Sequence, residues 1–230
     1  MSYNPLIAVT TYNKLSMTKK TSEWFCDLGY DLLYIDDFSI DGTQEYISQI
    51  KVDAILKNKR RGLTDSWNRA YAYFKTSEHT HLIICNNDLL IPRGAIENML
   101  SNHPLVVPVC NEQGAGYACK EQSIKKNRGG FAFDVNAEEN VQATQDAIGM
   151  ADAFIPVNCW TGFCMCLSRD ILDWDVGGNL FDPKNINTGN DDDLGGRVPA
   201  RLALGAFVYH FKGVSFNGKI GGRNDLSTTY

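Results

Sequence analysis

The sequence predicts an α/β protein in which a mostly parallel central sheet is flanked by helices in a single, Rossmann-like domain. Short apolar runs begin near residues 6, 32, 54, 82 and 105, and segments of helical periodicity separate them. Strands that alternate with helices at this spacing indicate βαβ units and a parallel sheet. The 230 residues are 43% hydrophobic and 21% charged, which is ordinary for a globular chain with a sizeable core.

The first strand is expected at residues 6–12, because Leu-Ile-Ala-Val-Thr-Thr-Tyr is a short apolar run that ends in polar side chains. Its polar end comprises Thr10, Thr11, Tyr12 and Asn13. A helix is expected at residues 16–28, and the glycine that follows stands where a C-terminal cap belongs.

The second strand, residues 32–35, stops at two adjacent acids, Asp36 and Asp37. Asp41 and Gln44 have the spacing of a capping box for the next helix. Asp36 and Asp37 are then left for a ligand, such as ribose hydroxyls or a base N–H. The alternative is that both are solvated loop acids.

A weaker third strand, residues 54–56, precedes the basic loop Asn58-Lys59-Arg60-Arg61-Gly62. Thr64 is expected to cap a helix whose buried face recurs at positions i, i+3, i+4 and i+7. A basic loop before a helix N-terminus suits a diphosphate. A solvated charged surface explains Arg60 and Arg61 equally well. The expected buried face comprises Trp67, Ala70, Tyr71 and Phe74.

The fourth strand, residues 81–85, leads into Asn86, Asn87 and Asp88. Polar side chains at the carboxyl end of a buried strand are where an open α/β sheet builds a ligand site. One carboxylate beside neutral amides suits Mn²⁺ or Mg²⁺ bridged to phosphate oxygens. The alternative is a polar strand end that leads into a turn.

A helix with a proline near its start is expected at residues 92–99, and another strand at residues 105–110. Residues 111–152 are polar and weakly periodic, which predicts a long inserted or mobile loop over the site. A strand at residues 158–167 and a short helix at residues 168–174 follow.

Three consecutive aspartates begin the last predicted helix, where they suit the helix dipole. Because capping needs only one of them, a carboxylate held near a metal-bound diphosphate could serve as a general base. The last strand, residues 206–211, contains His210, which is either a core histidine or a metal ligand. The tail at residues 218–230 is expected to be loose.

Several classes of protein are excluded. The net charge of −5 gives no indication of a nucleic-acid surface, and no apolar run is long enough for a membrane span. The seven cysteines lie mostly in apolar runs, without zinc-site spacing. With no signal peptide at the N-terminus, they indicate reduced thiols in a cytoplasmic protein. Dinucleotide-binding, Walker and Gly-x-Ser-x-Gly motifs are all absent.

The order and spacing of the polar segments resemble the family 2 glycosyltransferases of GT-A fold. The resemblance runs from about residue 5 to residue 216, and each segment is weakly specific alone. The matching segments are Thr10–Asn13, Ile35–Thr43, Asn58–Asn68, Asn86–Asp88, Thr161–Phe163, Asp191–Leu194 and Tyr209–Ser215.

The resemblance implies inverting transfer of a sugar from a nucleoside-diphosphate sugar to a saccharide or glycoprotein acceptor, assisted by Mn²⁺ or Mg²⁺. Asp88 matches the last acid of the metal-binding Asp-x-Asp, and His210 matches a late histidine that can complete the metal site. Asp191 matches the catalytic acid. The donor and acceptor sugars are assigned to Trp160, Thr161, Gly162 and Asp192. The nucleotide sugar is assigned to Thr10, Thr11, Tyr12, Asn13, Asp36, Asp37, Arg60, Arg61, Asn68, Asn86 and Asn87.

Two positions depart from the family pattern. Asn86 replaces the first acid of Asp-x-Asp, so either metal affinity is lower or Asp88 alone ligates. Asn190 replaces a glutamate, which leaves the catalytic role open between Asp191 and its neighbours.

The expected transferase domain covers residues 1–217. It has a nucleotide-binding half (1–110), the inserted segment (111–152) and an acceptor half (153–217). Little chain follows the late histidine, so the chain is either a compact enzyme or a domain of a longer protein. Two other functions stay open: a non-catalytic nucleotide-sugar or glycan-binding module, and a sugar nucleotidyltransferase. The second lacks its expected Gly-rich loop after the first strand.

Overall fold

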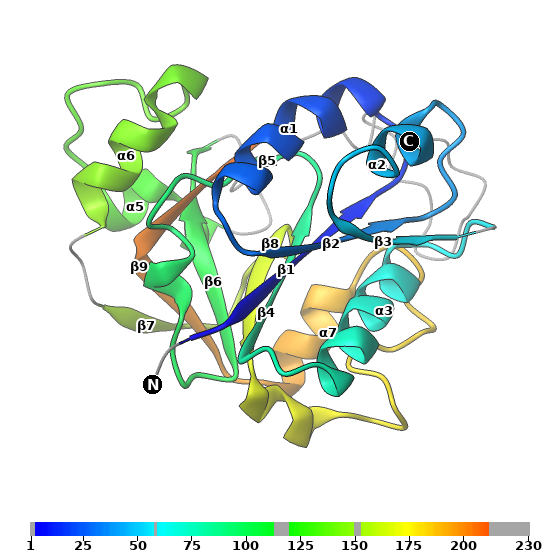
Figure 1. Ribbon diagram of the computed structural model, residues 1–230. Helices are drawn as coiled ribbons and strands as arrows, with labels where there is room; N and C mark the ends of the chain where they lie inside the picture. The colour runs from blue at the N-terminus through cyan, green and yellow to red at the C-terminus, as the bar shows by residue number, and fades with distance from the viewer. Residues whose placement is uncertain (1–2, 58, 113–119, 150–152, 212–230) are drawn as a thin grey trace.

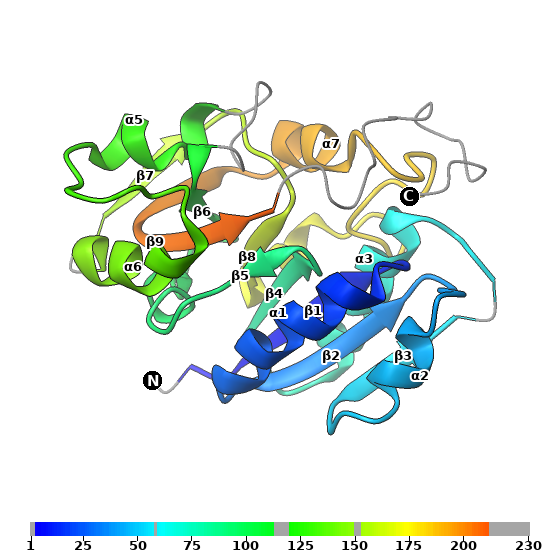
Figure 2. The same ribbon diagram turned by 90° about the horizontal axis from the view of Figure 1, so that it is seen from above.

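The computed structural model describes residues 3–57, 59–112, 120–149 and 153–211. The predicted tail at 218–230 and Asn58 of the basic loop lie outside these ranges. One sheet organises the described chain, with the strand order β3-β2-β1-β4-β8-β6-β9-β5, and β7 pairs with β9. Helices cover both faces of this sheet (Figures 1 and 2).

The first half is the predicted parallel unit. β2 pairs with β1 and β3, and β1 pairs with β4, all in parallel. Each crossover between these strands contains a helix, as the alternating pattern predicts. The elements are β1 (Pro5–Thr11), α1 (Leu15–Asp27), β2 (Asp31–Asp36), α2 (Thr43–Ile47), β3 (Asp53–Leu56), α3 (Leu63–Thr76) and β4 (His81–Asn86).

Both faces of β1, β2 and β4 are buried, which explains their nearly continuous apolar runs, whereas the edge strand β3 is largely exposed. Leu6 and Ala8 of β1 join the core that includes Phe74 of α3. Ile7 of β1 joins the opposite core, which includes Phe25 of α1. The predicted buried face of α3 is confirmed: Trp67, Ala70, Tyr71 and Phe74 are all at most 3% exposed.

The second half mixes strand directions. β8 lies antiparallel between β4 and β6, so the fifth apolar run of the sequence does not neighbour the fourth. β6 and β9 pair in parallel, while β5 and β7 pair antiparallel with β9. These elements are β5 (Leu89–Leu90), β6 (Leu105–Cys110), β7 (Phe154–Val157), β8 (Cys164–Ser168) and β9 (Ala200–His210).

The segment at 111–152 contains helices in its described part rather than the loop expected from its composition. Buried Val141 and Ile148 lie in its last helix, which packs on β9, and the elements at residues 120–128 pack on β6. Buried Gln145 uses both ends of its amide, since Nε2 donates to Gly205 O (2.8 Å) and Oε1 accepts from Phe207 N (2.7 Å). The elements are η2 (Lys120–Gln122), α5 (Ile124–Arg128), η3 (Glu138–Asn140) and α6 (Val141–Ile148).

The remaining helices are short. The helix expected at 92–99 reduces to turns and the 3₁₀-helix η1 (Glu97–Met99), and the one at 168–174 is the 3₁₀-helix η4 (Arg169–Trp174). α7 (Asn190–Arg197) begins, as predicted, at the three aspartates.

Gly29 follows the end of α1 with φ +74°, as the predicted C-terminal cap requires, but the two predicted N-terminal helix caps are wrong. Asp41 accepts hydrogen bonds from Leu15 N and Thr43 N, while Gln44 donates to Asp36 instead of closing a capping box. Thr64 lies inside α3, and its hydroxyl donates to Asn190 Oδ1 (2.8 Å). These polar side chains therefore join separate elements, which local spacing does not reveal.

Gly62 provides a test of this packing. Its φ is +90°, and a Cβ there would lie 2.7 Å from Ile186 O. Gly178 has φ +92° with no heavy atom within 4 Å of such a Cβ. Both alanine variants incur backbone strain, but only Gly62→Ala adds a clash worth about 1–3 kcal/mol. Thermal unfolding should show a lower Tm for Gly62→Ala than for Gly178→Ala, by roughly 2–4 °C per kcal/mol. Equal losses in the two variants would contradict this packing.

Candidate active site

The polar ends of three parallel strands meet at one edge of the sheet. The register pairs Thr11 of β1 with Asp36 of β2, and Thr10 of β1 with Asn86 of β4. Thr10 Oγ1 lies 3.4 Å from Asn86 Oδ1. These side chains therefore lie together at the carboxyl edge of the parallel strands.

Asp88 and His210 lie at the same edge and face each other. The antiparallel pairing of β5 with β9 sets Leu89 opposite His210, and Phe211 N donates to Asp88 O (3.0 Å). The distance from His210 Nε2 to Asp88 Oδ2 is 3.6 Å. Asp88 is 1% exposed and His210 is 9% exposed. Two residues that are 122 positions apart in the sequence thus form one pair of potential ligands.

His210 is held through both its backbone and its ring. Its backbone N–H donates to Asn111 Oδ1 (2.9 Å), and its ring stacks on Phe163 at 4.7 Å between centroids. Among the described residues, His210 Nδ1 is buried with no hydrogen-bond partner. A buried polar atom in this condition is a candidate for a ligand contact.

A divalent ion fits this donor set. Carboxylate and imidazole are both ligands that Mn²⁺ accepts, and an ion held by two side chains keeps positions for phosphate oxygens. Within the described ranges, no group of three or more His, Cys, Asp or Glu side chains forms a closed metal site. Asp88 and His210 would therefore hold the ion together with the substrate.

Asp191 is the aspartate of the acidic triplet that faces the site. It lies in the first turn of α7, and its Oδ2 accepts a hydrogen bond from Gly162 N (3.2 Å). Burial raises the pKa of Asp191, and the charge of Asp192 raises it further, while the hydrogen bond from Gly162 lowers it. Asp192 is exposed, and Asp193 forms an ion pair with Arg197 (2.8 Å). Of the three aspartates, Asp191 is therefore the one whose carboxylate accepts a backbone hydrogen bond from the segment before β8.

The backbone at 162–163 connects Asp191 to the ligand pair. Gly162 N donates to Asp191, while Phe163 O accepts from Asn86 N (3.0 Å) and the Phe163 ring stacks on His210. Close packing holds this segment in place. A Cβ on Gly162 would lie 2.6 Å from the Trp67 ring, and one on Gly195 of α7 would lie 3.0 Å from Trp160 Nε1.

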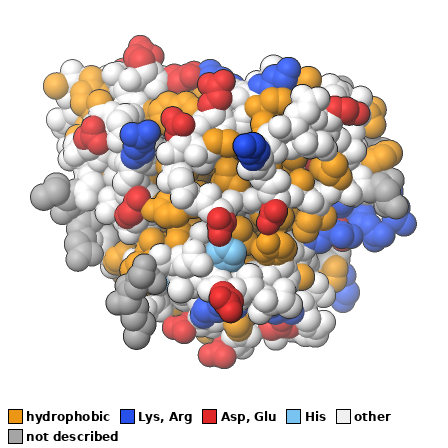
Figure 3. All heavy atoms as spheres, viewed as in Figure 1, with side chains coloured by type: hydrophobic (Ala, Val, Ile, Leu, Met, Phe, Trp, Pro, Cys, Tyr) orange, Lys and Arg blue, Asp and Glu red, His pale blue; other side chains and the backbone are white. Residues whose placement is uncertain are grey.

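Tyr12 and Arg60 form the outer wall of the site. The Arg60 guanidinium lies over the Tyr12 ring, 4.3 Å from its centroid, which is a cation–π distance. The neighbouring Asn13 has φ +55°, and its Oδ1 accepts from Ile40 N (2.9 Å). Figure 3 shows basic side chains gathered at the edge of the molecule where the loop after β3 lies. Arg61 of that loop is exposed.

Asp36 and Asp37 are neither free for a ligand nor solvated. Asp36 accepts from Ser39 N (2.8 Å) and Gln44 Nε2 (2.5 Å). Asp37 pairs with Lys57 Nζ (2.8 Å), a buried lysine that sequence reasoning missed. Asp37 also accepts from the backbone N–H groups of residues 61 and 62, both at 2.8 Å. The two acids therefore shape the loops around the site.

Asn87 and Asn68 likewise make structural contacts. Asn87 Nδ2 donates to Thr11 Oγ1 (3.1 Å) and Thr18 Oγ1 (2.9 Å), which joins β1, α1 and the end of β4. The Asn68 side chain instead binds backbone groups of Leu180 and Phe181. Of these two residues assigned to the nucleotide sugar, only Asn87 lies at the site edge, and its amide is engaged there.

Sequence reasoning also missed Asn111 and Gln122. Gln122 Oε1 accepts from Thr161 N (2.7 Å), so the inserted segment reaches the site. Neither residue matched a motif. Their only signal is an amide side chain next to a predicted strand or inside a polar segment, and this is too common to be informative.

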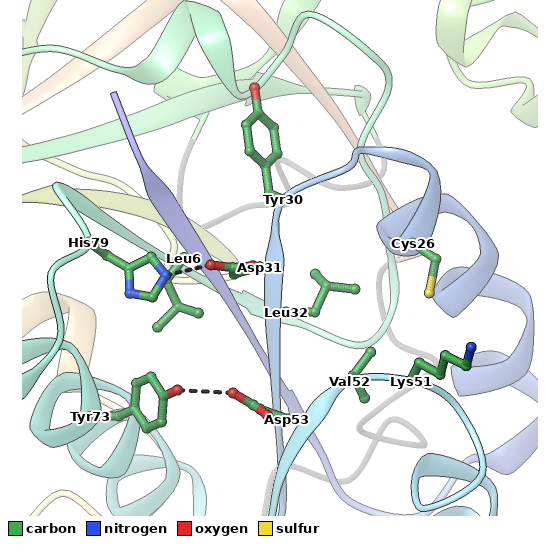
Figure 4. Close-up of a pocket in the computed structure, with 10 residues that line it drawn as sticks. All are labelled: Leu6, Cys26, Tyr30, Asp31, Leu32, Lys51, Val52, Asp53, Tyr73 and His79. Carbon is green, nitrogen blue, oxygen red and sulfur yellow. Dashed lines mark hydrogen bonds and ion pairs between the residues drawn. The ribbon is translucent and has the colours of Figure 1, made fainter. Parts of the chain in front are cut away.

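A hollow of about 470 Å³ lies at the opposite, amino edge of the sheet (Figure 4). Asp31 there contacts His79 (3.0 Å), and Asp53 accepts from the Tyr73 hydroxyl (3.0 Å). None of the residues assigned to the active site lines this hollow. It lies where β2 and β3 begin, whereas α/β sheets bind their ligands beyond the carboxyl ends of the strands.

The central sheet with helices on both faces has the architecture of the GT-A α/β fold. Residues 6–104 match the family described as "Glycosyl transferase family 2". This match confirms the predicted resemblance over that segment. It supports a transferase as the class of enzyme.

Solved structures show the same fold. GalNAc-T7 with UDP, GalNAc and Mn²⁺ aligns with a TM-score of 0.61 and 14% identity over 90% of this chain and 43% of its own. The mannosyltransferase PcManGT from Pyrobaculum calidifontis, in complex with GDP-Man and Mn²⁺, aligns at 0.58 and 14% identity over 91% and 57%. The inositol-1-phosphate CTP transferase from T. maritima aligns at 0.50 and 8% identity over 91% and 89%.

This chain therefore spans about half the length of the first two structures that it matches. A comparison with curated protein sequences finds no match. Within the described residues, no helix has both the length and the apolar character needed to cross a membrane.

The partly buried charge of Asp191 has a predictable effect on stability. Because its pKa is raised in the folded chain, folding disfavours its ionised form, and its favourable contribution is lost as the pH rises through the folded pKa. Asp191→Asn should stabilise the protein by roughly 0.5–1 kcal/mol at pH 7.5. This gain should vanish below the ordinary carboxyl pKa, where the wild-type side chain is also neutral.

Denaturant unfolding at pH 7.5 and at acidic pH measures this difference. Asp170→Asn is the control, since Asp170 is exposed and its loss should change stability by less than about 0.5 kcal/mol. Destabilisation of Asp191→Asn at pH 7.5 would show that the carboxylate is stabilised by its surroundings.

Proposed function

We propose that this protein is an inverting glycosyltransferase that moves a sugar from a nucleoside-diphosphate sugar to an acceptor hydroxyl. The proposal rests on one observation: a pair of potential metal ligands and a carboxylate are linked by a short backbone segment at one edge of the sheet. Asp88 and His210 form a buried donor pair, and Asp191 is joined to that pair through Gly162 and Phe163. The family match of residues 6–104 supports the same class of reaction.

The donor nucleotide would lie along the ends of β1, β2 and β4. Tyr12 and Arg60 offer a planar surface for a base, and Thr10 offers a hydroxyl near Asn86. Arg61 is exposed at the outer edge, where its charge suits a diphosphate. Asp36, Asp37 and Asn87 would act mainly by shaping this surface, because other protein groups already occupy their side chains.

Asp88 and His210 would hold Mn²⁺ or Mg²⁺ against the diphosphate. When bound, such an ion offsets the negative charge that develops on the leaving nucleoside diphosphate. Two of the similar structures contain Mn²⁺ with UDP or GDP-Man, which supports a divalent ion in this protein.

Asp191 would remove the proton of the acceptor hydroxyl as its oxygen attacks the anomeric carbon opposite the leaving group. The configuration at that carbon is inverted as a result. Burial raises the pKa of Asp191, which makes the carboxylate a stronger base than an exposed aspartate. The Gly162 N–H fixes its orientation, and in-line positioning supplies much of the remaining rate enhancement.

Trp160, Thr161, Gly162 and exposed Asp192 would form the acceptor side of the site. Trp160 is 5% exposed and packs on Gly195, so it acts chiefly as a rigid support. A saccharide or glycoprotein acceptor is the class implied by the family resemblance. The GalNAc seen with GalNAc-T7 supports a carbohydrate ligand at such a site.

Donor turnover tests the proposal directly. UDP-, GDP- and dTDP-sugars are supplied with and without Mn²⁺, together with saccharide acceptors, and nucleoside diphosphate release and thermal stabilisation are measured. One donor should respond, and its response should depend on the ion. Binding without turnover by any donor would favour a non-catalytic module. Consumption of a nucleoside triphosphate with release of pyrophosphate would favour a nucleotidyltransferase.

With the responding donor, Asp191→Asn should lower the transfer rate by about 10²–10⁴-fold, the range supplied by a general base. Donor affinity, measured by calorimetry, should stay within about twofold, because Asp191 is placed on the acceptor side. Asp170→Asn should behave as wild type. Near-normal turnover by Asp191→Asn would exclude it as the base.

Asp88→Asn should weaken Mn²⁺ binding in the presence of UDP or GDP by more than about tenfold, because loss even of groups that support metal ligands costs 10–100-fold. Titration of free Mn²⁺ by electron paramagnetic resonance measures this affinity, again with Asp170→Asn as the control. Unchanged affinity would place the ion elsewhere.

A further inference from the structure

Gln122 is a fully buried amide that connects the inserted segment to the active site. It is 0% exposed and ends the short helix η2. Its Oε1 accepts from Thr161 N (2.7 Å), and its Nε2 donates to Pro108 O (3.1 Å). Both ends of the amide are therefore satisfied, and the side chain bridges β6 to the segment before β8.

The backbone around Gln122 is itself anchored. Ser123 forms an isolated parallel bridge with Cys110, and its hydroxyl donates to Glu112 Oε1 (2.6 Å). Ser123 also caps α5 by accepting from Lys126 N. Gln122 thus projects from a fixed point beside β6, so it can set the position of the chain that it binds.

The chain that it binds leads directly to Asp191. Thr161 precedes Gly162, whose N–H donates to Asp191 Oδ2 (3.2 Å). Trp67 blocks movement of Gly162 toward α3, since even a Cβ there would lie 2.6 Å from the ring. Gln122 restrains the neighbouring residue, because its Oε1 accepts the hydrogen bond from Thr161 N. The Thr161–Gly162 backbone is therefore held from two sides beside Asp191.

We propose that Gln122 is a positioning residue for the transfer reaction, which holds the Thr161–Gly162 backbone so that the Gly162 N–H orients Asp191. This inference rests on the proposed function, because it assigns Gln122 to the base of that reaction. It also gives the inserted segment a role in catalysis, although Gln122 itself touches neither Asp191 nor a substrate.

A change in the acidity of Asp191 follows if Gln122 is lost. The hydrogen bond from Gly162 lowers the pKa of Asp191, while burial and the charge of Asp192 raise it. Asp192, on the same helix, is the charged neighbour, and the facing segment contributes the neutral Gly162 amide. Losing this hydrogen bond removes the largest lowering effect on the pKa of Asp191, while the backbone N–H groups of Asp191 and Asp192 still lower it. The pKa then rises, and a smaller fraction of Asp191 is ionised at a given pH.

Gln122→Leu is the test variant, because leucine has a similar size and makes no hydrogen bond. Gln145→Leu is the matched control. Gln145 is another buried glutamine whose amide holds two backbone groups, but these are Gly205 and Phe207 in β9. The measurements are the pH dependence of kcat, the donor KM, and an NMR titration of the Asp191 carboxyl carbon in the free protein.

In Gln122→Leu, the acid limb of kcat and the NMR titration should both move to higher pH, by about 0.5 unit or more. The donor KM should stay within about twofold, because the nucleotide edge is unchanged. Gln145→Leu should lose stability but keep the wild-type limb and titration. Gln122→Met repeats the test with a more adaptable side chain if the leucine variant does not fold.

The inference would be overturned if Gln122→Leu left both the acid limb of kcat and the NMR titration of Asp191 unchanged. Equal shifts in both leucine variants would also overturn it. The NMR titration does not require turnover. If no sugar transfer is found but only Gln122→Leu shifts the Asp191 titration, the positioning role stands and the proposed function fails.

Discussion

The antiparallel contact between β5 and the end of β9 is the interaction on which the site depends. β5 has only two residues, yet its pairing sets Leu89 opposite His210 and brings Asp88 within 3.6 Å of the imidazole. β9 reaches that point from the far half of the sheet, where β6 and α6 hold it. A short strand pair therefore joins the parallel half of the fold to the half that carries the late histidine.

The parallel half of the fold was predictable because each of its strands has a pattern that is visible in its own short segment of sequence. Strands buried on both faces read as apolar runs, and their polar ends mark the edge where ligands bind. The second half was not predictable in this way. An apolar run such as residues 105–110 does not reveal that β8 inserts between β4 and β6, since strand order depends on distant parts of the chain. In the same way, the polar character of residues 120–149 concealed helices held by a few buried side chains.

The acidic and amide residues show a second limit on what the sequence can predict about the site. Asp88 faces His210 and Asp191 accepts a hydrogen bond from Gly162, whereas Asp37 is engaged by the buried Lys57 and Asn68 holds a distant backbone segment. A carboxylate or amide at a strand end suits a ligand and a neighbouring loop equally well. Only the positions of its partners distinguish the two, and those partners are far away in sequence. Gln122 was missed for the same reason, because its significance comes from Thr161, 39 positions later.

The central claim is that Asp88 and His210 hold a divalent ion at the edge where the nucleotide binds. Anomalous X-ray scattering from crystals grown with Mn²⁺ and UDP or GDP tests it most directly. One strong anomalous peak is expected about 2.0–2.3 Å from Asp88 and His210 side-chain atoms, in contact with the diphosphate. A bound nucleoside diphosphate whose Mn²⁺ contacts neither side chain would contradict it.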